Sequence, residues 1–579
     1  MHRHFKNNTP VNTGVLWGGG LWWGVTKGRG SAIHWLGYVW RACPSLTVLA
    51  FPTPTDTRRL SVMQDPKNRI SRRTALKGAA ASGVGLVVGS SLAEQSLKQV
   101  GAPPEAILGS NDEWFAQRAW SVSANKVLPQ ADGTTGNVTT LARRIEFPTS
   151  AEEIAAIVKL LPATTPIACV CGGHESSGAA LVADQDALIL DLGRLKSIDF
   201  ESSDDETLVT VGSGVVFREL VEAVKAHGGA LPVGTGPGVG VAGYTLNGGL
   251  SGYFSRRLGL LGQRAVKMTV VTADGEIRVL TPEDELFTAM LGAGSALAIV
   301  VDITFRLADA STIKGAEQHV FGFKTRNQAV EFSKKAMQFM KERVMPNESV
   351  SLEIVVTGTK AIVATTVFYD TFKGSTTEFV EPLEQLASGM KLPTLARAHW
   401  SSWYEAAAAL WPVIAEQKGN PLATSYHCVG TTGIPEDAVL DFVGDVVVGE
   451  APLDEAEMSI VEIRTLGGEA QRGPRIPSGN CDHAFFVDLV TLFDASAKSP
   501  VQRQEIVDLT NQVVDKSRAV AGLDVDFSGT HSQPDDVDRS AIAAEIFGSA
   551  AMARTIEAQK KQVDPDNRFR FNPFSKFVG

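Results

Sequence analysis

The sequence predicts an α+β fold, because crossovers through helices and a tight hairpin occur within the same region. Ser150 is a favourable N-cap, and apolar residues then recur at helical spacing over residues 151–161. Ala273-Asp274-Gly275 is a strong hairpin turn between apolar strands expected at 267–272 and 276–280. This mixture fits α+β better than a regular doubly wound sheet.

The other elements follow from short apolar or alternating runs bounded by turn residues. These runs predict strands at 167–170, 187–192, 207–211, 298–305, 349–356, 361–368, 423–428 and 458–464. Amphipathic stretches predict helices at 215–227, within 321–344 and at 506–520. The pattern changes near residue 310, so we expect a second unit to begin there.

Composition is that of an ordinary globular protein and argues against one class of partner. Hydrophobic residues make up 44% of the 579 residues and charged residues 20%. The net charge of −10 argues against a nucleic-acid partner, because neutralising phosphates needs a basic surface. The five cysteines show neither the pattern of a disulfide scaffold nor the paired spacing of a zinc site, and we predict no metal.

The first 93 residues differ from the rest of the chain. Residues 1–62 hold five of the ten tryptophans without any helical or strand period, which predicts a spurious or disordered extension; a genuine basic extension is the alternative. Residues 63–93 resemble a twin-arginine export signal, with Arg72-Arg73 before a short apolar run and a small-residue cleavage site at Ser91-Leu92-Ala93. That run is too short and too rich in glycine for a stable membrane span. We therefore expect an exported protein, periplasmic or extracellular.

Two glycine-rich loops suggest backbone held close to a large anionic ligand. Residues 172–178 and 234–249 each follow an apolar run, and their unhindered N–H groups can cradle a pyrophosphate. A nicotinamide-binding Rossmann unit at Gly212-Ser213-Gly214 is the competing interpretation. Its third small residue falls at Phe217, however, and no clear helix is evident after Gly240.

Several separated motifs, in the same order along the chain, resemble one family of flavoproteins. They are Cys171–Gly178, Leu188–Ile198, Val209–Gly214, Leu231–Gly234, Gly240–Gly243, Gly248–Leu260, Val270–Gly275, Asp302–Leu307 and Lys560–Asn572. The family is the FAD-linked oxidases of the vanillyl-alcohol oxidase/PCMH type, and within it the berberine-bridge-enzyme-like group. The resemblance covers roughly residues 146–307 and 547–572.

The resemblance implies a particular domain organisation. A PCMH-type FAD-binding domain of two subdomains would occupy residues 94–310 and be completed by a C-terminal return segment, 541–579. Residues 311–540 would form a substrate domain with an antiparallel sheet and helices.

The resemblance also implies the residues that hold FAD. They are Gly172, Gly173, His174, Glu175, Gly178, Gly236, Gly240, Gly243, Gly248, Gly249, Ile299, Val300 and Asn572. His174 matches the histidine that is bonded covalently to the flavin in many relatives. Relatives with two links carry a cysteine where this chain has Gly236, so a single link through His174 is expected.

The implied function is an exported FAD-dependent oxidoreductase acting on a CH–OH group. It would oxidise an alcohol, sugar or secondary metabolite by hydride transfer to flavin N5, with oxygen or another acceptor reoxidising the flavin. One departure supports an alternative, an FAD-binding protein without oxidase turnover: all six tyrosines precede residue 427, so the usual C-terminal active-site tyrosine is missing.

Another base would therefore have to take the hydroxyl proton. The candidates are His483, His531, Glu469 and Asp482, with Tyr404, Tyr426 and His427 as weaker ones. The aromatic residues Trp400, Trp403 and Tyr404 would form either a ring-stacking wall for a sugar or a packed core.

Overall fold

A computed structural model describes most of the chain beyond residue 143. The described residues are 14–16, 22–24, 114–115, 121–123, 142, 144–175, 178–181, 185–203, 205–313, 315–344, 349–357, 361–370, 377–409, 422–451, 458–494, 498–526, 539–575 and 577–578. Of the predicted N-terminal extension only the paired strands β1 (Gly14–Leu16) and β2 (Trp22–Gly24) are included, and the predicted signal at 63–93 lies outside the described residues.

The first subdomain is built on a small parallel sheet. Its strands run in the order β4 (Arg144–Glu146), β6 (Leu188–Asp191) and β5 (Ile167–Val170). Helix α6 (Ala151–Leu160) connects β4 to β5, and the Ser150 hydroxyl caps it by accepting from the Glu153 N–H at 3.2 Å. The predicted helix, cap and strand are confirmed here.

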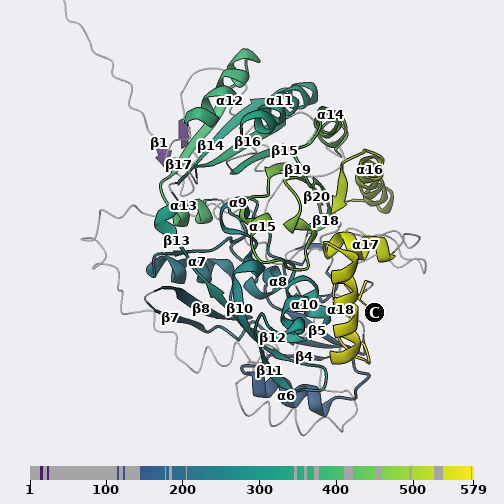
Figure 1. Ribbon diagram of the computed structural model, residues 1–579. Helices are drawn as coiled ribbons and strands as arrows, with labels where there is room; N and C mark the ends of the chain where they lie inside the picture. The colour runs from purple at the N-terminus through teal and green to yellow at the C-terminus, as the bar shows by residue number, and fades with distance from the viewer. Residues whose placement is uncertain are drawn as a thin grey trace, which may run out of the picture.

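The second subdomain is an antiparallel sheet, and this mixture confirms the α+β prediction (Figure 1). Its order is β11 (Ile277–Leu280), β10 (Ala265–Val271), β12 (Ile299–Arg306), β8 (Thr207–Gly212) and β7 (Ile198–Ser202). Because β8 has antiparallel neighbours on both sides, the Gly212–Gly214 turn after it belongs to no βαβ unit.

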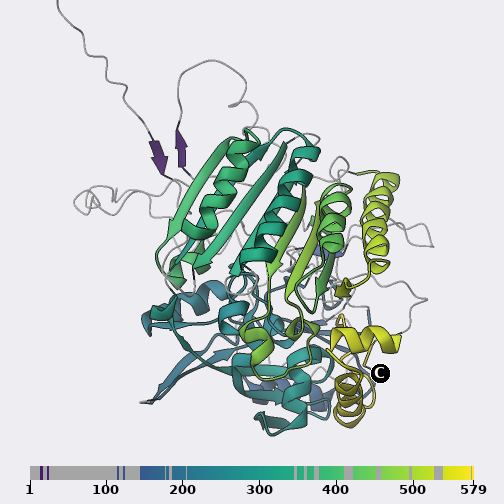
Figure 2. The ribbon, with the colours of Figure 1, turned by 45° about the horizontal axis from the view of Figure 1, so that its top comes forward.

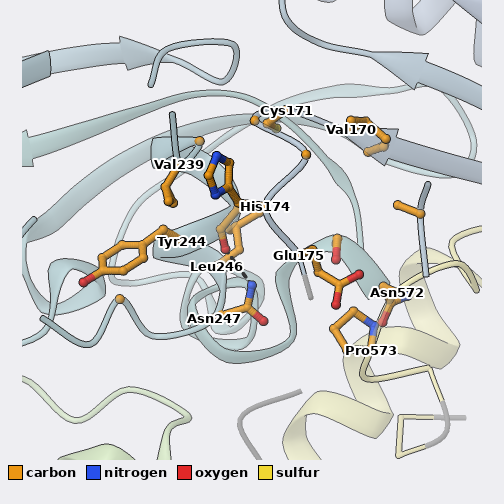
Figure 3. A pocket seen from close by; sticks show the side chains of 18 of the residues that line it. Val170, Cys171, His174, Glu175, Val239, Tyr244, Leu246, Asn247, Asn572 and Pro573 are labelled. Atoms are coloured by element: carbon orange, nitrogen blue, oxygen red, sulfur yellow. Dashed lines mark hydrogen bonds between the residues drawn. The ribbon is translucent and has the colours of Figure 1, made fainter. Parts of the chain in front are cut away.

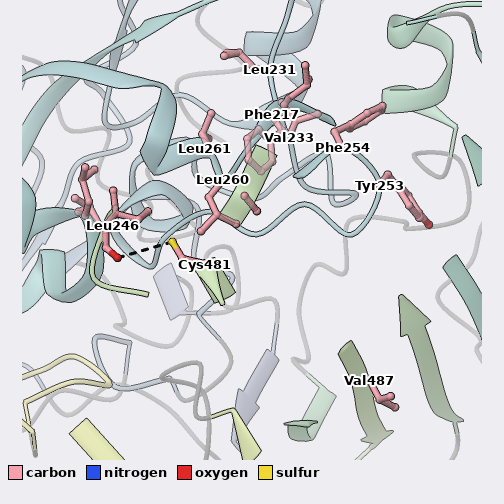
Figure 4. Close-up of a cluster of buried hydrophobic side chains, with 14 of the residues drawn as sticks. Phe217, Leu231, Val233, Leu246, Tyr253, Phe254, Leu260, Leu261, Cys481 and Val487 are labelled. Atoms are coloured by element: carbon pink, nitrogen blue, oxygen red, sulfur yellow. Dashed lines mark hydrogen bonds between the residues drawn. The ribbon is translucent and has the colours of Figure 1, made fainter. Parts of the chain in front are cut away.

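Helices α7 (Phe217–Ala226), α8 (Val241–Leu246), α9 (Ser255–Leu258) and α10 (Glu285–Ala293) accompany this sheet. One expectation was wrong: a helix does follow Gly240, namely the six-residue α8. Its brevity conceals it from periodicity, since six residues give fewer than two turns. Figure 4 shows the core around it, where Phe217, Leu231 and Leu260 are fully buried.

The substrate domain is one large sheet with helices along one face (Figure 2). Its order is β17 (Thr394–Trp400), β14 (Gly315–Phe323), β16 (Ala361–Asp370), β15 (Ser349–Thr357), β19 (Met458–Thr465), β20 (Phe485–Phe493), β18 (Leu422–Thr431) and β21 (Asp524–Asp526). These strands pair antiparallel, as predicted, and only β3 (Ser121–Ser123) joins β18 in parallel. The main helices are α11 (Arg326–Phe339), α12 (Thr377–Gly389), α14 (Asp437–Phe442) and α16 (Pro500–Arg518).

The aromatic group that follows β17 belongs to the core. Trp403, in α13 (Trp403–Ala408), is 1% exposed and donates from Nε1 to the Leu231 carbonyl at 3.1 Å. The Tyr404 hydroxyl contacts Glu222, and Lys225 lies over its ring. The packed-core alternative is therefore the correct one, and the cluster joins the two domains.

The C-terminus returns to the first subdomain. Helices α17 (Arg539–Ile546) and α18 (Ala550–Val563) pack together, and α18 lies against α10. The tail then reaches β5, where the Ile167 N–H donates to the Arg568 carbonyl at 2.8 Å. In the described part of the chain, no helix has the length and apolarity needed to cross a membrane.

Candidate functional site

A cavity of about 320 Å³ lies where both glycine loops, the tail and the substrate sheet meet (Figure 3). The first loop contributes Cys171 to Glu175, and the second contributes Gly240, Gly243 and Gly249. Phe571, Asn572 and Pro573 come from the tail, and Tyr426, Arg464 and Phe486 from the sheet. A mostly apolar hollow with a few converging polar groups is the usual form of a cofactor site.

The two glycine loops touch each other through their backbones, and this contact requires glycine. A Cβ added to Gly172 would lie 2.3 Å from the Gly240 nitrogen, and one on Gly240 would lie 2.7 Å from the Gly172 nitrogen. Gly173 and Gly249 adopt φ values of +70° and +78°, which side chains rarely tolerate. The loops thus form a narrow, bare backbone surface that a bulky anionic ligand can approach.

His174 projects from the first loop into this surface. The ring is half-buried and lies against the second loop, since a Cβ on Gly238 would come within 2.9 Å of Nε2. Burial lowers the pKa of His174 to about 4. The imidazole is therefore neutral at physiological pH, and a ring nitrogen keeps the lone pair that bond formation requires.

Two residues of the lining, Asn480 and Tyr244, have buried polar atoms. The Asn480 Oδ1 and the Tyr244 hydroxyl are buried without a well-formed hydrogen bond to any described residue. Burial raises the pKa of Tyr244, against smaller opposing effects of Arg464 and the Ser251 hydroxyl.

The sheet contributes a buried cluster of polar side chains. Asp488 on β20 is fully buried and lies directly opposite Cys428 on β18. Its carboxylate accepts from the Tyr426 hydroxyl at 2.8 Å, the Cys428 thiol at 2.8 Å and an Arg464 nitrogen at 2.7 Å. Arg464 also pairs with Glu462, which lies two residues before it on the same face of β19. Burial and the charge of Asp488 raise the pKa of Tyr426 well above its usual value.

The predicted cofactor residues divide into two groups. Gly172, Gly173, His174, Glu175, Gly240, Gly243, Gly249, Val300 and Asn572 line the cavity. Gly178, Gly236, Gly248 and Ile299 lie outside its lining, and Ile299 is packed in the core beneath β5 and β6. Gly236 nevertheless lies near His174, because a Cβ there would come 4.0 Å from the His174 Cε1.

Of the main candidate bases, the three that the structure describes, Glu469, Asp482 and His483, lie outside the cavity lining. Glu469 is exposed and pairs with Arg472 at 2.6 Å, and Asp482 pairs with Arg475. His483 is buried against Gly430 and Phe486 at the end of the sheet. His531 lies outside the described residues.

Of the weaker candidates, only Tyr426 lines the cavity; His427 points to the opposite face, where its Nε2 lies 3.3 Å from the Ser425 hydroxyl. Sequence reasoning missed Tyr244, Arg464, Asn480 and Phe486. Strand alternation was a usable signal for part of this face, because it places Glu462 beside Arg464 and Phe486 beside Asp488.

Comparisons with known proteins agree with this arrangement. Residues 142–281 match the family described as FAD binding domain. Glucooligosaccharide oxidase of Sarocladium strictum is 32% identical over 224 residues, which cover 36% of this chain and 42% of that protein. The matches span less than half the length of the first curated relatives.

Solved structures extend the likeness over most of the chain. Chitooligosaccharide oxidase has a TM-score of 0.64 at 19% identity, covering 84% of this chain and 99% of that one. Glucooligosaccharide oxidase from Acremonium strictum, whose structure is described as containing 6-S-cysteinyl, 8α-N1-histidyl FAD, has a TM-score of 0.60 at 20% identity, covering 75% and 92%. The chain therefore carries an FAD binding domain and has the fold of the PCMH-type FAD-linked oxidases, with relatives in the berberine-bridge-enzyme-like group.

Proposed function

We propose that the protein is an FAD-dependent oxidoreductase that oxidises a CH–OH group of a small molecule. The observation that carries this proposal is the cavity with two unlike walls, bare glycine backbone on one side and the Tyr426–Asp488 pair on the other. The glycine loops and Asn572 would hold FAD. Relatives named as oligosaccharide oxidases support sugars as the first substrates to test, beside simple alcohols and secondary metabolites.

FAD, when bound, supplies the acceptor for the hydride that leaves the substrate carbon. The chain must then take the hydroxyl proton. Tyr426 stays protonated near neutral pH because its pKa is raised, so it cannot act as a base alone. It can accept the substrate proton at its oxygen while its own proton passes to Asp488 across the 2.8 Å hydrogen bond. Arg464 donates to the other oxygen of this carboxylate at 2.7 Å and so holds it in place beside Tyr426.

The Tyr426→Phe variant tests this route, because it removes the relaying hydroxyl and leaves the ring. We expect kcat to fall by about a hundredfold with FAD content unchanged, the usual size of a lost acid–base group. The control is His427→Gln, on the opposite face of β18. Unchanged kcat in Tyr426→Phe would refute this route for the proton.

We also propose a single covalent bond between His174 and the flavin. The neutral, half-buried ring and the glycine at position 236 support one link rather than two. Wild-type protein should be yellow, and the colour should stay with the protein after acid precipitation. The His174→Ala variant should release its flavin into the supernatant, whereas release from wild type as well would contradict the covalent bond.

The same purified protein distinguishes an oxidoreductase from the main alternative, a protein that binds FAD without turnover. The missing C-terminal tyrosine is the observation behind that alternative. Anaerobic mixing with a panel of alcohols and oligosaccharides should bleach the flavin band if the protein is an oxidoreductase. Yellow protein that no member of the panel bleaches would favour the binding protein, and colourless protein after reconstitution with FAD would refute both.

Export is proposed on the twin-arginine pattern at Arg72-Arg73 within residues 63–93. Those residues fused to a folded reporter should carry it out of the cytoplasm. The Arg72→Lys/Arg73→Lys pair should abolish that transport.

A further inference from the structure

Three charged side chains are buried at the end of α18, away from the Tyr426–Asp488 pair. Lys560, Asp564 and Arg568 are 3%, 1% and 3% exposed. Charged residues are almost never buried this deeply unless they are paired and hydrogen-bonded, because removing a charge from water is costly. The three residues lie where the C-terminal tail leaves α18 and turns towards the cavity.

Asp564 organises this turn. One carboxylate oxygen accepts from Lys560 Nζ at 2.6 Å and from the Phe569 N–H at 2.9 Å, and the other accepts from the Arg568 N–H at 2.8 Å. Asn567 within the turn has a φ of +50°, a left-handed conformation that asparagine tolerates. The carboxylate therefore fixes the direction in which the tail leaves the helix.

The partners of Asp564 also form hydrogen bonds with two segments of the chain that lead to cavity residues. Lys560 Nζ also donates to the Ala296 carbonyl at 2.7 Å, and Ala296 lies between the cavity residues Ser295 and Ala298. The Arg568 guanidinium donates to the Ala273 carbonyl at 2.6 Å. The Arg568 carbonyl accepts from Ile167, the first residue of the strand that delivers the His174 loop.

The tail that follows is itself part of the cavity wall. The Asn572 side chain donates to the Phe569 carbonyl at 2.6 Å and accepts from the Phe574 N–H at 2.9 Å. Both polar atoms of Asn572 are thus used to hold the tail in shape. Figure 3 places Asn572 and Pro573 beside Glu175 of the first loop.

We propose that Asp564 is a positioning residue for the cofactor: it locks the Phe571–Pro573 wall and, through Lys560 and Arg568, couples that wall to Ser295–Ala298 and to the His174 strand. The proposal rests on the proposed function only in taking FAD as the occupant. Asp564 itself does not line the cavity, so any effect on bound flavin must pass through the walls that it holds.

The Asp564→Asn variant tests the proposal on a His174→Ala background, where a covalent link cannot mask dissociation. We expect FAD retention to weaken about tenfold, the result of losing one or two charge-assisted hydrogen bonds. The visible absorption band of the flavin that remains bound should also change, because the wall beside it has moved. The matched control is Glu557→Gln, which removes an exposed carboxylate paired with Lys561 on the same helix and should change neither property.

A second variant tests whether Asp564 acts by positioning the cavity walls or only by balancing the charge of Lys560. Asp564→Asn combined with Lys560→Gln removes both members of the Lys560–Asp564 ion pair, so part of the lost thermal stability should return while FAD retention stays weak. Recovery of retention and spectrum in this double variant would overturn the proposal. If the His174→Ala protein binds FAD and Asp564→Asn on that background binds it equally well with the same spectrum, the inference fails alone; if wild type binds no FAD, the proposed function fails with it.

Discussion

The two walls of the cavity are built by different means. The loop wall is backbone, shaped by contacts such as that of Gly172 with Gly240, and most of its residues come from two short stretches of chain. The sheet wall is made of side chains, with Tyr426, Arg464 and Phe486 contributed by three separate strands and Asp488 buried behind Tyr426. Bare backbone suits a large anionic cofactor, whereas converging side chains suit recognition and proton transfer.

This difference separates cofactor binding from turnover. Changes in the loop wall should remove FAD and turnover together, because nothing remains to accept the hydride. Changes in the sheet wall should remove turnover while the protein stays yellow. Variants on each wall therefore have distinguishable outcomes.

The largest effect is expected from Asp488→Ala. This change removes the buried carboxylate that pairs with Arg464 and accepts from Tyr426 and Cys428. Breaking a buried pair in this way costs about 3–5 kcal/mol of unfolding free energy, and turnover should fall at least as far as in Tyr426→Phe. Denaturant titration and stopped-flow reduction measure the two effects. Asp445→Asn, in an exposed pair with Lys334, is the control and should show neither.

The contrast between the walls also explains how much of the candidate site could be predicted from the sequence. The sequence predicted that the two glycine loops and His174 would lie together at one ligand, since they belong to contiguous motifs, and most of these residues line one cavity; their contact with FAD stays a prediction. The sheet wall was not predicted, because Tyr426 and Asp488 meet only through strand order, and 62 residues separate them. Single-strand alternation indicates which residues share a face, but not which strands become neighbours.

The C-terminal return segment was also predicted only in part. The resemblance implied that Asn572 lies near the flavin, and in the structure Asn572 lines the cavity. The burial of Asp564 had no local signal, because Lys560 in α18 and the C-cap residue Asp564 have the i,i+4 spacing of an ordinary exposed helix pair.

A smaller effect on stability, with a distinct outcome, is expected from Gly172→Ala in the loop wall. The added methyl would meet the Gly240 nitrogen at 2.3 Å and the Gly238 carbonyl at 2.7 Å, so the loops must separate. We expect a loss of about 2 kcal/mol in unfolding free energy and protein purified without FAD. Gly243→Ala is the matched control for the fold, since its Cβ meets no described atom within 4 Å. Normal stability and FAD content in Gly172→Ala would show that this contact does not shape the loop wall.

The smallest expected effect is a pH-dependent loss of stability caused by His427, which lies on the face of β18 that points away from the cavity. Burial, aided by Arg518, lowers the pKa of His427 to about 3, whereas the unfolded chain titrates near 6.5. The unfolded state therefore binds the extra proton first, and stability falls as pH drops below about 6.5 towards the folded value. Between pH 7 and pH 5 this loss should be about 1–2 kcal/mol for wild type and should largely disappear in His427→Gln. Denaturant midpoints at the two pH values measure it. A change in kcat or FAD content in the same variant would contradict the assignment of function to the opposite face, because His427 and Tyr426 are adjacent in sequence but separated by the sheet.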